Sequence, residues 1–492
     1  MDYAGRSARF SRDGDAFVVE YLENNLPFRR FRVTRTMGWR YEQDYIAVQT
    51  HGPEPAGDPV YTEESRIRFA YSVDRSRWFP QSYLEPTEYP GSEYLEDGSL
   101  RYAPYKPDRN AFNERCARCH NTYPYDLRFY KMHTEFGMLS GFPPGPGAGP
   151  AEARSLAASV GDLSVFEAKQ KIPKERFVSV GISCESCHFG GREHASTEGK
   201  VPIRFVPTHP DLADWTPSHV GAQKDPAVVN AICRQCHHSG VSAADNWPDG
   251  SAGVNSMESV EMDAGGCVSE IRCTHCHNTH VSGPNAGTPD RAEHISACLT
   301  CHENYGSESA AALHSRHEVG TATCLDCHMP RIVQGFGVYN RTHRIASPTD
   351  PAILGTGMPN ACNLCHLDKS LAWTGDALEQ GWGKRVDLSP RLQGLYAQGL
   401  QRPVGEAWLS HPFVLTRLVA AGAYAGSPLG LEVLPRLLRA LDEPNAYLRI
   451  GFLQNVEKIL GRPLSDAEFA ITGHDSVRQK QAQRLIERFI RD

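Results

Sequence analysis

Seven copies of the pattern Cys-x-x-Cys-His are the part of this sequence that could carry out chemistry. They use 14 of the 15 cysteines in a chain of 492 residues. Random placement of cysteine and histidine would give roughly 0.02 copies of this signature of c-type haem attachment. Numbered along the chain, motifs 1 to 7 are residues 116–120, 184–188, 233–237, 273–277, 298–302, 324–328 and 362–366.

Each motif supplies the groups that hold one haem. Two thiols three positions apart can add to the two vinyl groups on one edge of the porphyrin, and the histidine that follows is then placed under the iron as its proximal axial ligand. The expected attachment residues are Cys116, Cys119, Cys184, Cys187, Cys233, Cys236, Cys273, Cys276, Cys298, Cys301, Cys324, Cys327, Cys362 and Cys365. The expected proximal ligands are His120, His188, His237, His277, His302, His328 and His366. The sequence thus predicts seven haem c groups per chain.

Structural zinc and disulfide bonds are the two alternative uses for so many cysteines. Zinc sites usually pair two Cys-x-x-Cys knuckles, whereas seven is an odd number, and the histidine that ends every copy would go unexplained. Disulfides do not require that histidine either. Covalent haem is therefore the interpretation that the pattern favours.

Composition excludes several classes of protein. Hydrophobic residues make up 40% and charged residues 22%, which is typical of a globular chain, and no apolar run is long enough to span a bilayer. The net charge is −7. Nucleic acid is therefore not an expected partner, because phosphate binding needs a basic surface.

The chain divides into three expected domains. Residues 1–105 hold no cysteine and form a small β-rich region, with strands expected at 16–21, 31–34, 45–48 and 67–71. Residues 106–370 hold all seven motifs and form a multihaem cytochrome c domain with little regular secondary structure, in which short helices surround packed porphyrins. Residues 371–492 show helical periodicity and form an all-α region.

Two similar strings in the last region predict a helical repeat. Residues 410–418 and 442–450 lie 32 positions apart, and each has a proline, Pro412 or Pro444, at the expected first helical position. A second helix is expected between them, at about residues 429–441. Paired helices of this period are typical of HEAT-like repeats, which often present a binding face. An ordinary helical cap on the haem domain is an equal alternative.

Several strings resemble a family of secreted multihaem c-type cytochromes related to the cytochrome c554 and octahaem oxidoreductase group. They are residues 181–188 leading to 192–194, residues 324–330 leading to 341–344, residues 357–366, and the shorter strings 9–15 and 77–79. The resemblance covers most of residues 8–370. Members usually carry a further haem module before the β-rich region. The resemblance therefore implies that the native precursor has an eighth haem, or that a partner occupies the place of this module.

The other side of each iron needs a second ligand, and fourteen further histidines are enough for bis-histidine ligation throughout. The resemblance implies distal roles for His194, which follows a motif by a short loop, and for His343. His314 and His317 precede motif 6 as an upstream ligand would, and one of them is expected to be a bystander. The other candidates are His133, His280 and His294. Bystander or structural roles are expected for His238, His275, His411 and His474.

The fifteenth cysteine, Cys267, lies six residues before motif 4. The resembling family often places a distal histidine near this position, so a Cys267 thiolate could bind an iron there. An anionic ligand of this kind stabilises ferric iron and lowers the reduction potential. The alternatives are a small buried residue with no redox role, or a thiol that reacts or forms a cross-link.

Electron transfer through a chain of seven closely packed haems is the expected function. Bis-histidine ligation closes both faces of each iron, which suits a carrier rather than an enzyme. The alternative is a multihaem oxidoreductase with one open catalytic haem that acts on a small nitrogen or sulfur oxyanion such as nitrite or tetrathionate, or on hydroxylamine. In the resembling ammonia-forming nitrite reductases a lysine replaces the motif histidine of the catalytic haem, and no motif here has this change.

The expected partners and location follow from the cofactor. Redox proteins are the expected donors and acceptors, a further partner could dock on the C-terminal helical repeats, and a homo-oligomer or filament is possible. Covalent haem attachment takes place outside the cytoplasm, so a periplasmic, extracellular or cell-surface location is expected. Residues 1–10 have neither the basic nor the apolar segment of a signal peptide, which is therefore expected to be missing from this chain.

Overall fold

The computed structural model forms two compact units. It describes residues 2–3, 6–38, 41–73, 75–80, 112, 116–122, 177–205, 225–237, 246–280, 291–335, 338–386, 392, 396, 399–443, 446–471, 473 and 475–490. Unit 1 comprises residues 1–106, 241–255 and 304–492, and unit 2 comprises residues 107–240 and 256–303. Motifs 1 to 5 therefore belong to unit 2, and motifs 6 and 7 belong to unit 1. The three-domain division of the sequence stays a prediction.

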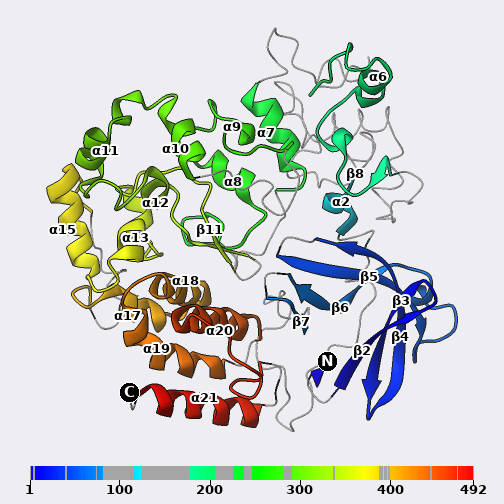
Figure 1. Cartoon of the computed structure of the whole chain (residues 1–492). Helices are drawn as coiled ribbons and strands as arrows, with labels where there is room; N and C mark the ends of the chain where they lie inside the picture. Colours follow the sequence, from blue (N-terminus) through cyan, green and yellow to red (C-terminus); the bar gives the residue numbers. More distant parts are fainter. Residues whose placement is uncertain are drawn as a thin grey trace. The chain divides into compact units, whose positions relative to one another are not determined.

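Seven antiparallel strands in chain order form the N-terminal part of unit 1 (Figure 1). The strands are β1 (Asp2–Tyr3), β2 (Arg6–Asp13), β3 (Ala16–Glu23), β4 (Leu26–Met37), β5 (Glu42–His51), β6 (Ser65–Ser72) and β7 (Arg77–Pro80), with a short helix η1 (Pro59–Tyr61) between β5 and β6. All four expected strands are confirmed. Asn24 and Asn25 join β3 to β4 with φ angles of 51° and 62°, as a two-residue hairpin turn requires.

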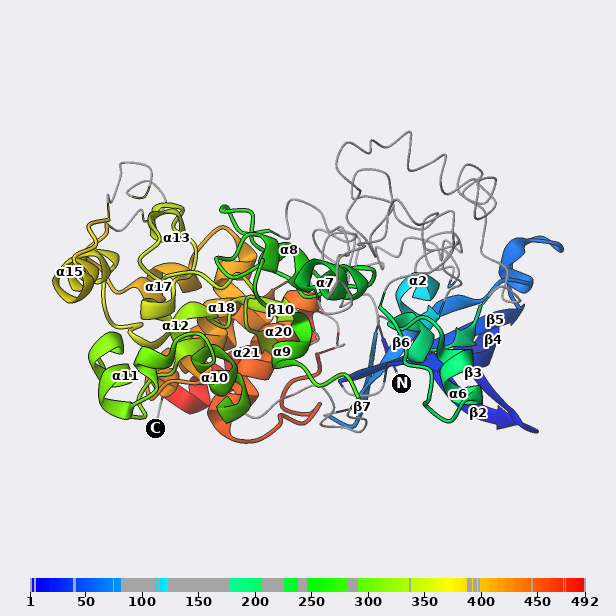
Figure 2. The same cartoon turned by 90° about the horizontal axis from the view of Figure 1, so that it is seen from above.

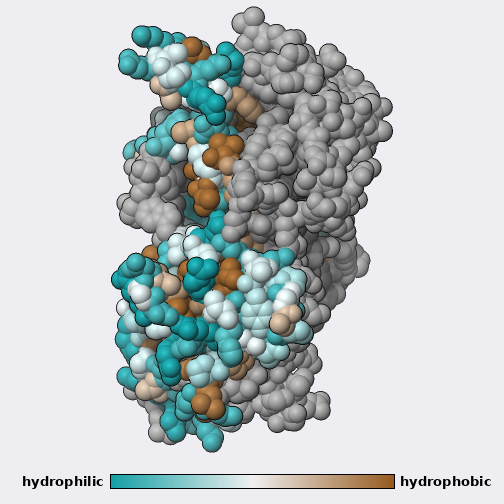
Figure 3. Space-filling view, turned by 90° about the vertical axis from the view of Figure 1, so that its right-hand side faces the viewer, coloured by the Kyte–Doolittle hydropathy of each residue, from teal (hydrophilic) through white to brown (hydrophobic). Residues whose placement is uncertain are grey.

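Apolar side chains of these strands contribute to the core of unit 1. Val19, Tyr21 and Phe31 are buried, and the Tyr21 and Phe31 rings lie 4.8 Å apart. Phe17 is exposed although it shares a face of β3 with Val19 and Tyr21, and Val18 on the other face is buried. Figure 3 shows that the coloured part of one side of the molecule is mainly hydrophilic, with small separate hydrophobic patches. Burial along β3 therefore does not follow a strict period of two.

The remainder of unit 1 is helical apart from one hairpin of β10 (Val333–Gly335) and β11 (Val338–Asn340). The helices that carry or follow motifs 6 and 7 are α11 (Glu308–Ser315), α12 (Cys324–His328), α13 (Pro351–Gly355), α14 (Ala361–Cys365), α15 (Leu371–Trp382) and α17 (Val404–Leu409). The last helices are α18 (Val414–Ala425), α19 (Gly430–Arg439), η11 (Ala440–Asp442), α20 (Ala446–Leu460) and α21 (Asp475–Ile490).

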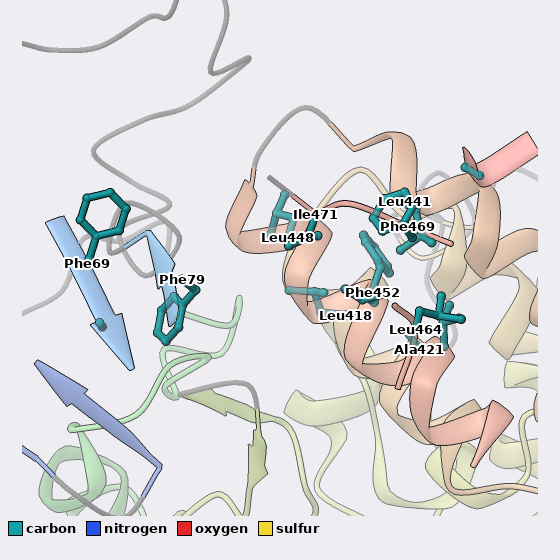
Figure 4. Close-up of a cluster of buried hydrophobic side chains, with 14 of the residues drawn as sticks. Phe69, Phe79, Leu418, Ala421, Leu441, Leu448, Phe452, Leu464, Phe469 and Ile471 are labelled. Atoms are coloured by element: carbon teal, nitrogen blue, oxygen red, sulfur yellow. The ribbon is translucent and has the colours of Figure 1, made fainter. Parts of the chain in front are cut away.

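The last four α-helices form two stacked pairs. α18 packs on α20, and α19 packs on both α20 and α21. Figure 4 shows Leu441, Phe452 and Phe469 pointing toward one another between these helices, and all three are almost fully buried. The helical prediction for this region is confirmed, including a second helix close to residues 429–441. The HEAT-like assignment itself stays a prediction.

One detail of the repeat prediction is wrong. Pro412 is not the first helical residue, because α18 begins at Val414 with Phe413 as its N-cap. The Phe413 backbone N–H donates to His411 Nδ1 at 3.0 Å, so the chain makes a turn before the helix starts. His411 therefore has the structural role that was expected of it. Pro444 lies outside the described residues.

The β-sheet and the last helices share one apolar core in unit 1. Phe69 and Phe79 of the strands belong to the same buried cluster as Leu418 and Phe452. Two ion pairs join the same parts of the chain. Arg75 lies 2.8 Å from Glu457, and Arg77 lies 3.2 Å from Asp466.

Unit 2 consists of short helices and long connections, as Figure 2 shows for the segments around α7, α8 and α9. Its elements are α2 (Ala117–His120), β8 (Asn121–Thr122), β9 (Ser179–Val180), η6 (Cys184–Ser186), α6 (Gly191–Ser196), α7 (Pro226–Arg234), α8 (Glu258–Asp263), α9 (Cys273–Cys276) and α10 (Arg291–Leu299). The short helix η10 (Glu303–Tyr305) begins at the end of this unit. Its largest described apolar cluster centres on Val228, with Phe189 and Phe205 packed against it. Among the described residues, no helix has the length and hydropathy of a membrane span.

Candidate functional site

Every Cys-x-x-Cys-His motif includes or follows one turn of helix. Motifs 1, 4, 6 and 7 occupy α2, α9, α12 and α14, motif 2 occupies η6, and motifs 3 and 5 lie at the ends of α7 and α10. In five motifs the histidine N–H donates to the carbonyl of the first cysteine over 2.8 to 3.0 Å, as in His188 to Cys184 at 2.8 Å. This bond from residue i+4 to residue i places the first thiol and the imidazole on the same side of the turn. The sequence spacing thus produces the local geometry that haem attachment needs.

Four motif histidines have a second histidine ring at a nearly constant distance. The ring centroids are separated by 6.0 Å in His188–His280, 5.9 Å in His277–His294, 6.2 Å in His314–His328 and 6.0 Å in His317–His366. The corresponding angles between ring planes are 6°, 71°, 5° and 32°. Each pair joins one expected proximal ligand to one expected distal candidate. The first two pairs belong to unit 2 and the last two to unit 1.

This spacing fits one metal ion held between two imidazoles. An imidazole nitrogen lies roughly 2 Å from a first-row metal that it binds, so two rings on opposite sides of the ion have centroids roughly 6 Å apart. The residues present therefore fit bis-histidine ligation. The sequence expected only one of His314 and His317 to be a ligand, but the structure places each beside a different motif histidine.

The surroundings of these rings favour neutral imidazole. Burial lowers the pKa of His188, and the neighbouring His280 and His194 lower it further. Burial likewise lowers the pKa of His366, with His317 as the next cause. A histidine binds a metal through the lone pair of its neutral ring. The electrostatics of both pairs are therefore consistent with ligand roles.

Backbone carbonyls orient several of the candidate ligands. His328 Nδ1 lies 2.9 Å from the Ala346 carbonyl, His317 Nδ1 lies 2.6 Å from the Ser315 carbonyl, and His194 Nδ1 lies 2.8 Å from the Val201 carbonyl. A carbonyl can only accept, so Nδ1 carries the proton and Nε2 keeps its lone pair. Metal-bound histidines are commonly oriented in this way. His194 therefore has the tautomer that a distal ligand needs.

Motifs 1, 3 and 4 approach one another within unit 2. The Cys119 thiol lies 3.9 Å from the Cys236 carbonyl, and the Cys236 thiol lies 3.9 Å from the Cys119 carbonyl. Asn230 of α7 bridges motifs 3 and 4, because its side chain donates to the Ile271 carbonyl and accepts from the Cys273 N–H, both at 2.9 Å. The cysteines of motifs 1 and 3 therefore lie close together, and motif 4 is held beside the helix that carries motif 3.

Arg341, which the sequence did not single out, holds motif 6 in unit 1, and Arg344 of the same segment pairs with other parts of the unit. Arg341 donates to the Leu325 carbonyl at 2.6 Å, the Met329 carbonyl at 3.1 Å and Asp326 at 2.8 Å. Arg344 pairs with Asp249 and, at 3.1 Å, with Asp350. Within residues 341–344, only His343 was expected to have a role. The arginines at the two ends of this segment were the signal that could have identified these positioning residues.

The other candidates have different surroundings. Cys267 is half-buried in the turn after α8, where its carbonyl accepts from the Glu270 and Ile271 N–H groups at 3.0 and 3.1 Å, and a thiolate ligand stays a prediction. His343 is half-buried and stays a candidate. His275 accepts from the Arg272 backbone N–H and contacts its guanidinium, which fits its expected bystander role. His133, His238 and His474 lie outside the described residues.

All fifteen cysteines are described, and none is joined in a disulfide. Within the described ranges, no group of three or more histidine, cysteine, aspartate or glutamate side chains is placed to hold a metal ion. The paired histidines supply two ligands at each place, which leaves the remaining coordination to a planar group such as a porphyrin.

Comparison with known proteins gives little further information. No protein-family model and no curated protein matches the chain. Among solved structures, the chain is similar to the crystal structure of the outer cell wall cytochrome OcwA, with a TM-score of 0.35 and 13% sequence identity. The match covers 92% of this chain and 85% of that one. This TM-score does not define a shared fold, so functional assignment depends on this chain's own residues.

Proposed function

We propose that this chain is an extracytoplasmic multihaem cytochrome c that transfers electrons. The observation that carries the proposal is the set of four histidine pairs with ring centroids 5.9 to 6.2 Å apart, each of which includes a motif histidine. Sequence spacing alone supplies a histidine after each pair of thiols. A second ring at the distance of a shared metal ion is an independent feature that zinc knuckles and disulfides do not explain.

The residues have distinct roles in holding the haems. The two cysteines of each motif form the thioether bonds, and the motif histidine binds one side of the iron. His280, His294, His314 and His317 bind the other side in motifs 2, 4, 6 and 7. When bound, haem supplies an iron that alternates between ferric and ferrous states, with a potential set by its axial ligands and surroundings. The candidates His133, His194, His343 and Cys267 remain for motifs 1, 3 and 5.

Paired imidazoles suit electron transfer better than substrate chemistry. Two protein ligands leave no position on the iron for a substrate, and neutral imidazoles need little rearrangement when the iron changes charge. The adjacent attachment points of motifs 1, 3 and 4 support close packing of the groups. Other redox proteins are the proposed donors and acceptors. The proposed location is extracytoplasmic, because covalent haem attachment takes place outside the cytoplasm.

A haem count combined with low-temperature EPR tests the proposal. We expect seven covalent haems per chain by mass spectrometry and pyridine haemochrome absorbance, with every ferric haem low-spin in EPR. Fewer than seven haems would contradict the proposed set of attachment sites. A stoichiometric high-spin signal would show an open iron and would favour the alternative, an oxidoreductase acting on a small nitrogen or sulfur oxyanion.

A further inference from the structure

A carboxylate contacts His237, the last residue of motif 3. His237 Nδ1 lies 2.9 Å from Glu258 Oε2, whereas His328 of motif 6 has its Nδ1 2.9 Å from the backbone carbonyl of Ala346. A carboxylate accepts the imidazole proton more strongly than a carbonyl does, because it carries a full negative charge. Two histidines that end the same motif therefore have Nδ1 partners of different chemistry.

Glu258 is held in place by its own helix terminus. It is the first residue of α8, and its second oxygen, Oε1, accepts from the Ser256 N–H at 3.0 Å. The next residue, Ser259, is buried and donates from its hydroxyl to the His237 carbonyl at 2.6 Å. The start of α8 thus contacts both the backbone and the ring of His237. The bonds to His237 and to the Ser256 N–H fix the position of the Glu258 carboxylate.

The far end of α8 contacts the same motif. Asp263, the last residue of the helix, forms an ion pair with Arg234, which lies between the two cysteines of motif 3. Met262 and Glu261 of the helix are buried. α8 therefore lies along motif 3 and contacts it at both ends, with Glu258 at the imidazole and Asp263 at Arg234.

We propose that Glu258 is a positioning residue that shares the Nδ1 proton of the iron ligand His237 and so lowers the reduction potential of the haem attached through Cys233 and Cys236. This inference rests on the proposed function, since it requires a haem at motif 3. A proton shared with the carboxylate gives the imidazole partial imidazolate character. The more basic ligand, together with the nearby negative charge, stabilises the ferric state over the ferrous state.

Glu258→Gln is the variant that tests this role. Glutamine keeps the size of the side chain and an oxygen that can accept the Nδ1 proton, but it has no negative charge. We expect the reduction equilibrium constant of one haem in seven to rise about tenfold, which is 59 mV for a one-electron couple. Spectroelectrochemical titration followed by EPR measures this shift, and one low-spin signal should change its anisotropy. Glu258→Asp keeps the charge and should stay closer to the wild-type potential than the glutamine variant.

Asp263→Asn is the matched control at the other end of α8. It removes the ion pair to Arg234 and leaves the Glu258–His237 contact, so we expect all potentials to stay as in the wild type. Equal shifts in Asp263→Asn and Glu258→Gln would overturn the inference, because docking of α8 would then be the cause. Seven haems with unchanged potentials in Glu258→Gln would overturn it too, while leaving the proposed function intact. Absence of haem from motif 3 in the wild-type protein would instead contradict the proposed function.

Discussion

The angle between the two ring planes differs from one histidine pair to the next, although the distance between the ring centroids is nearly the same. The rings of His188 and His280 are almost parallel at 6°, whereas those of His277 and His294 are steeply inclined at 71°. The relative orientation of two imidazole planes determines how their π orbitals overlap with the iron d orbitals. Parallel planes separate the energies of two of these orbitals and inclined planes bring them together. We therefore expect the motif 4 haem to give a more anisotropic low-spin signal than the motif 2 haem.

His294→Ala tests this assignment at motif 4. We expect one haem in seven to change from low-spin to high-spin and the most anisotropic low-spin EPR signal to disappear, because the second imidazole of that iron is removed. His275→Ala is the control, since His275 lies inside the same motif but its ring contacts Arg272. An unchanged spectrum for His294→Ala would remove His294 from the ligand set.

At the scale of elements, strand β5 carries two carboxyl groups with little access to water. Glu42 and Asp44 are 9% and 8% exposed, and Arg66 lies 3.9 Å from Asp44. Burial raises the pKa of Glu42 to about 9, and the charge of Asp44 is the next cause. Glu42 is therefore protonated in the folded protein at neutral pH. The proton on Glu42 removes one negative charge from this buried pair.

Glu42→Gln should make the protein more stable at alkaline pH. The folded pKa of Glu42 is above its ordinary value of 4.5, so the native state binds this proton more tightly than the unfolded state. Its contribution to stability is greatest below the unfolded pKa and is lost as the pH rises toward about 9. Glutamine cannot ionise, and we expect the gain to grow by at most about 1.4 kcal/mol for each pH unit above the ordinary pKa of 4.5 until the pH reaches about 9.

Thermal unfolding measured from pH 5 to pH 9 checks this pH dependence. Thr50→Ala on the same strand is the control, because threonine does not titrate in this range and any loss should be constant with pH. A parallel pH profile for Glu42→Gln and the wild type would show that Glu42 ionises normally in the folded protein.

The short helix α12 depends on an arginine from a later segment. Arg341 bonds to the Leu325 and Met329 carbonyls and to Asp326. Burial opposes ionisation of Asp326, but bonds from Arg341 and Thr323 outweigh it and lower the pKa of this carboxyl group. A helix of five residues has little stability of its own, so such outside partners determine whether it forms.

Arg341→Ala should destabilise unit 1 by about 2–3 kcal/mol, because it leaves a carboxylate and two carbonyls without a donor. Arg331→Ala is the control, since Arg331 is exposed and donates to the Tyr339 carbonyl at 2.8 Å. Thermal unfolding measures the difference, and haem mass shows whether motif 6 is still loaded. Equal stability of the two variants would contradict the positioning role of Arg341.

For the whole molecule, the N-terminal and C-terminal regions of the chain share one apolar core. Unit 1 joins residues 1–106 to residues 304–492, and one apolar core contains Phe69 and Phe79 together with Leu418 and Phe452. A second cluster contains Leu367, which directly follows motif 7, together with Trp408 of α17. The helical region therefore supports the sheet and motif 7 at the same time.

Deletion of residues 371–492 should disturb haem loading as well as any partner binding. We expect the haem count to fall from seven toward five, because motif 7 loses the apolar surface on which it packs and motif 6 belongs to the same unit, while motifs 1 to 5 belong to unit 2. Mass spectrometry of the truncated protein measures the count. A truncated chain that keeps all seven haems would support the three-domain division that the sequence predicts.

The sequence by itself determined the chemistry and the local elements of this protein. Motif spacing is a local property, so it specified the attachment residues and the helical turn that brings Cys184 and His188 together. Strands β3 to β6 and the helices after residue 371 were also predictable, because alternation with period two and spacing of three and four residues reflect which face is buried.

Only the tertiary structure decided which distant residues meet. His280 lies near His188, and Glu258 near His237, because chain segments return to the motif after long connections. The placement of His314 and His317 beside two different motif histidines could not be predicted for the same reason, since sequence proximity cannot show which motif each ring faces. The shared core of the N-terminal strands and the C-terminal helices brings together residues that are hundreds of positions apart, and no local sequence pattern predicts such a contact.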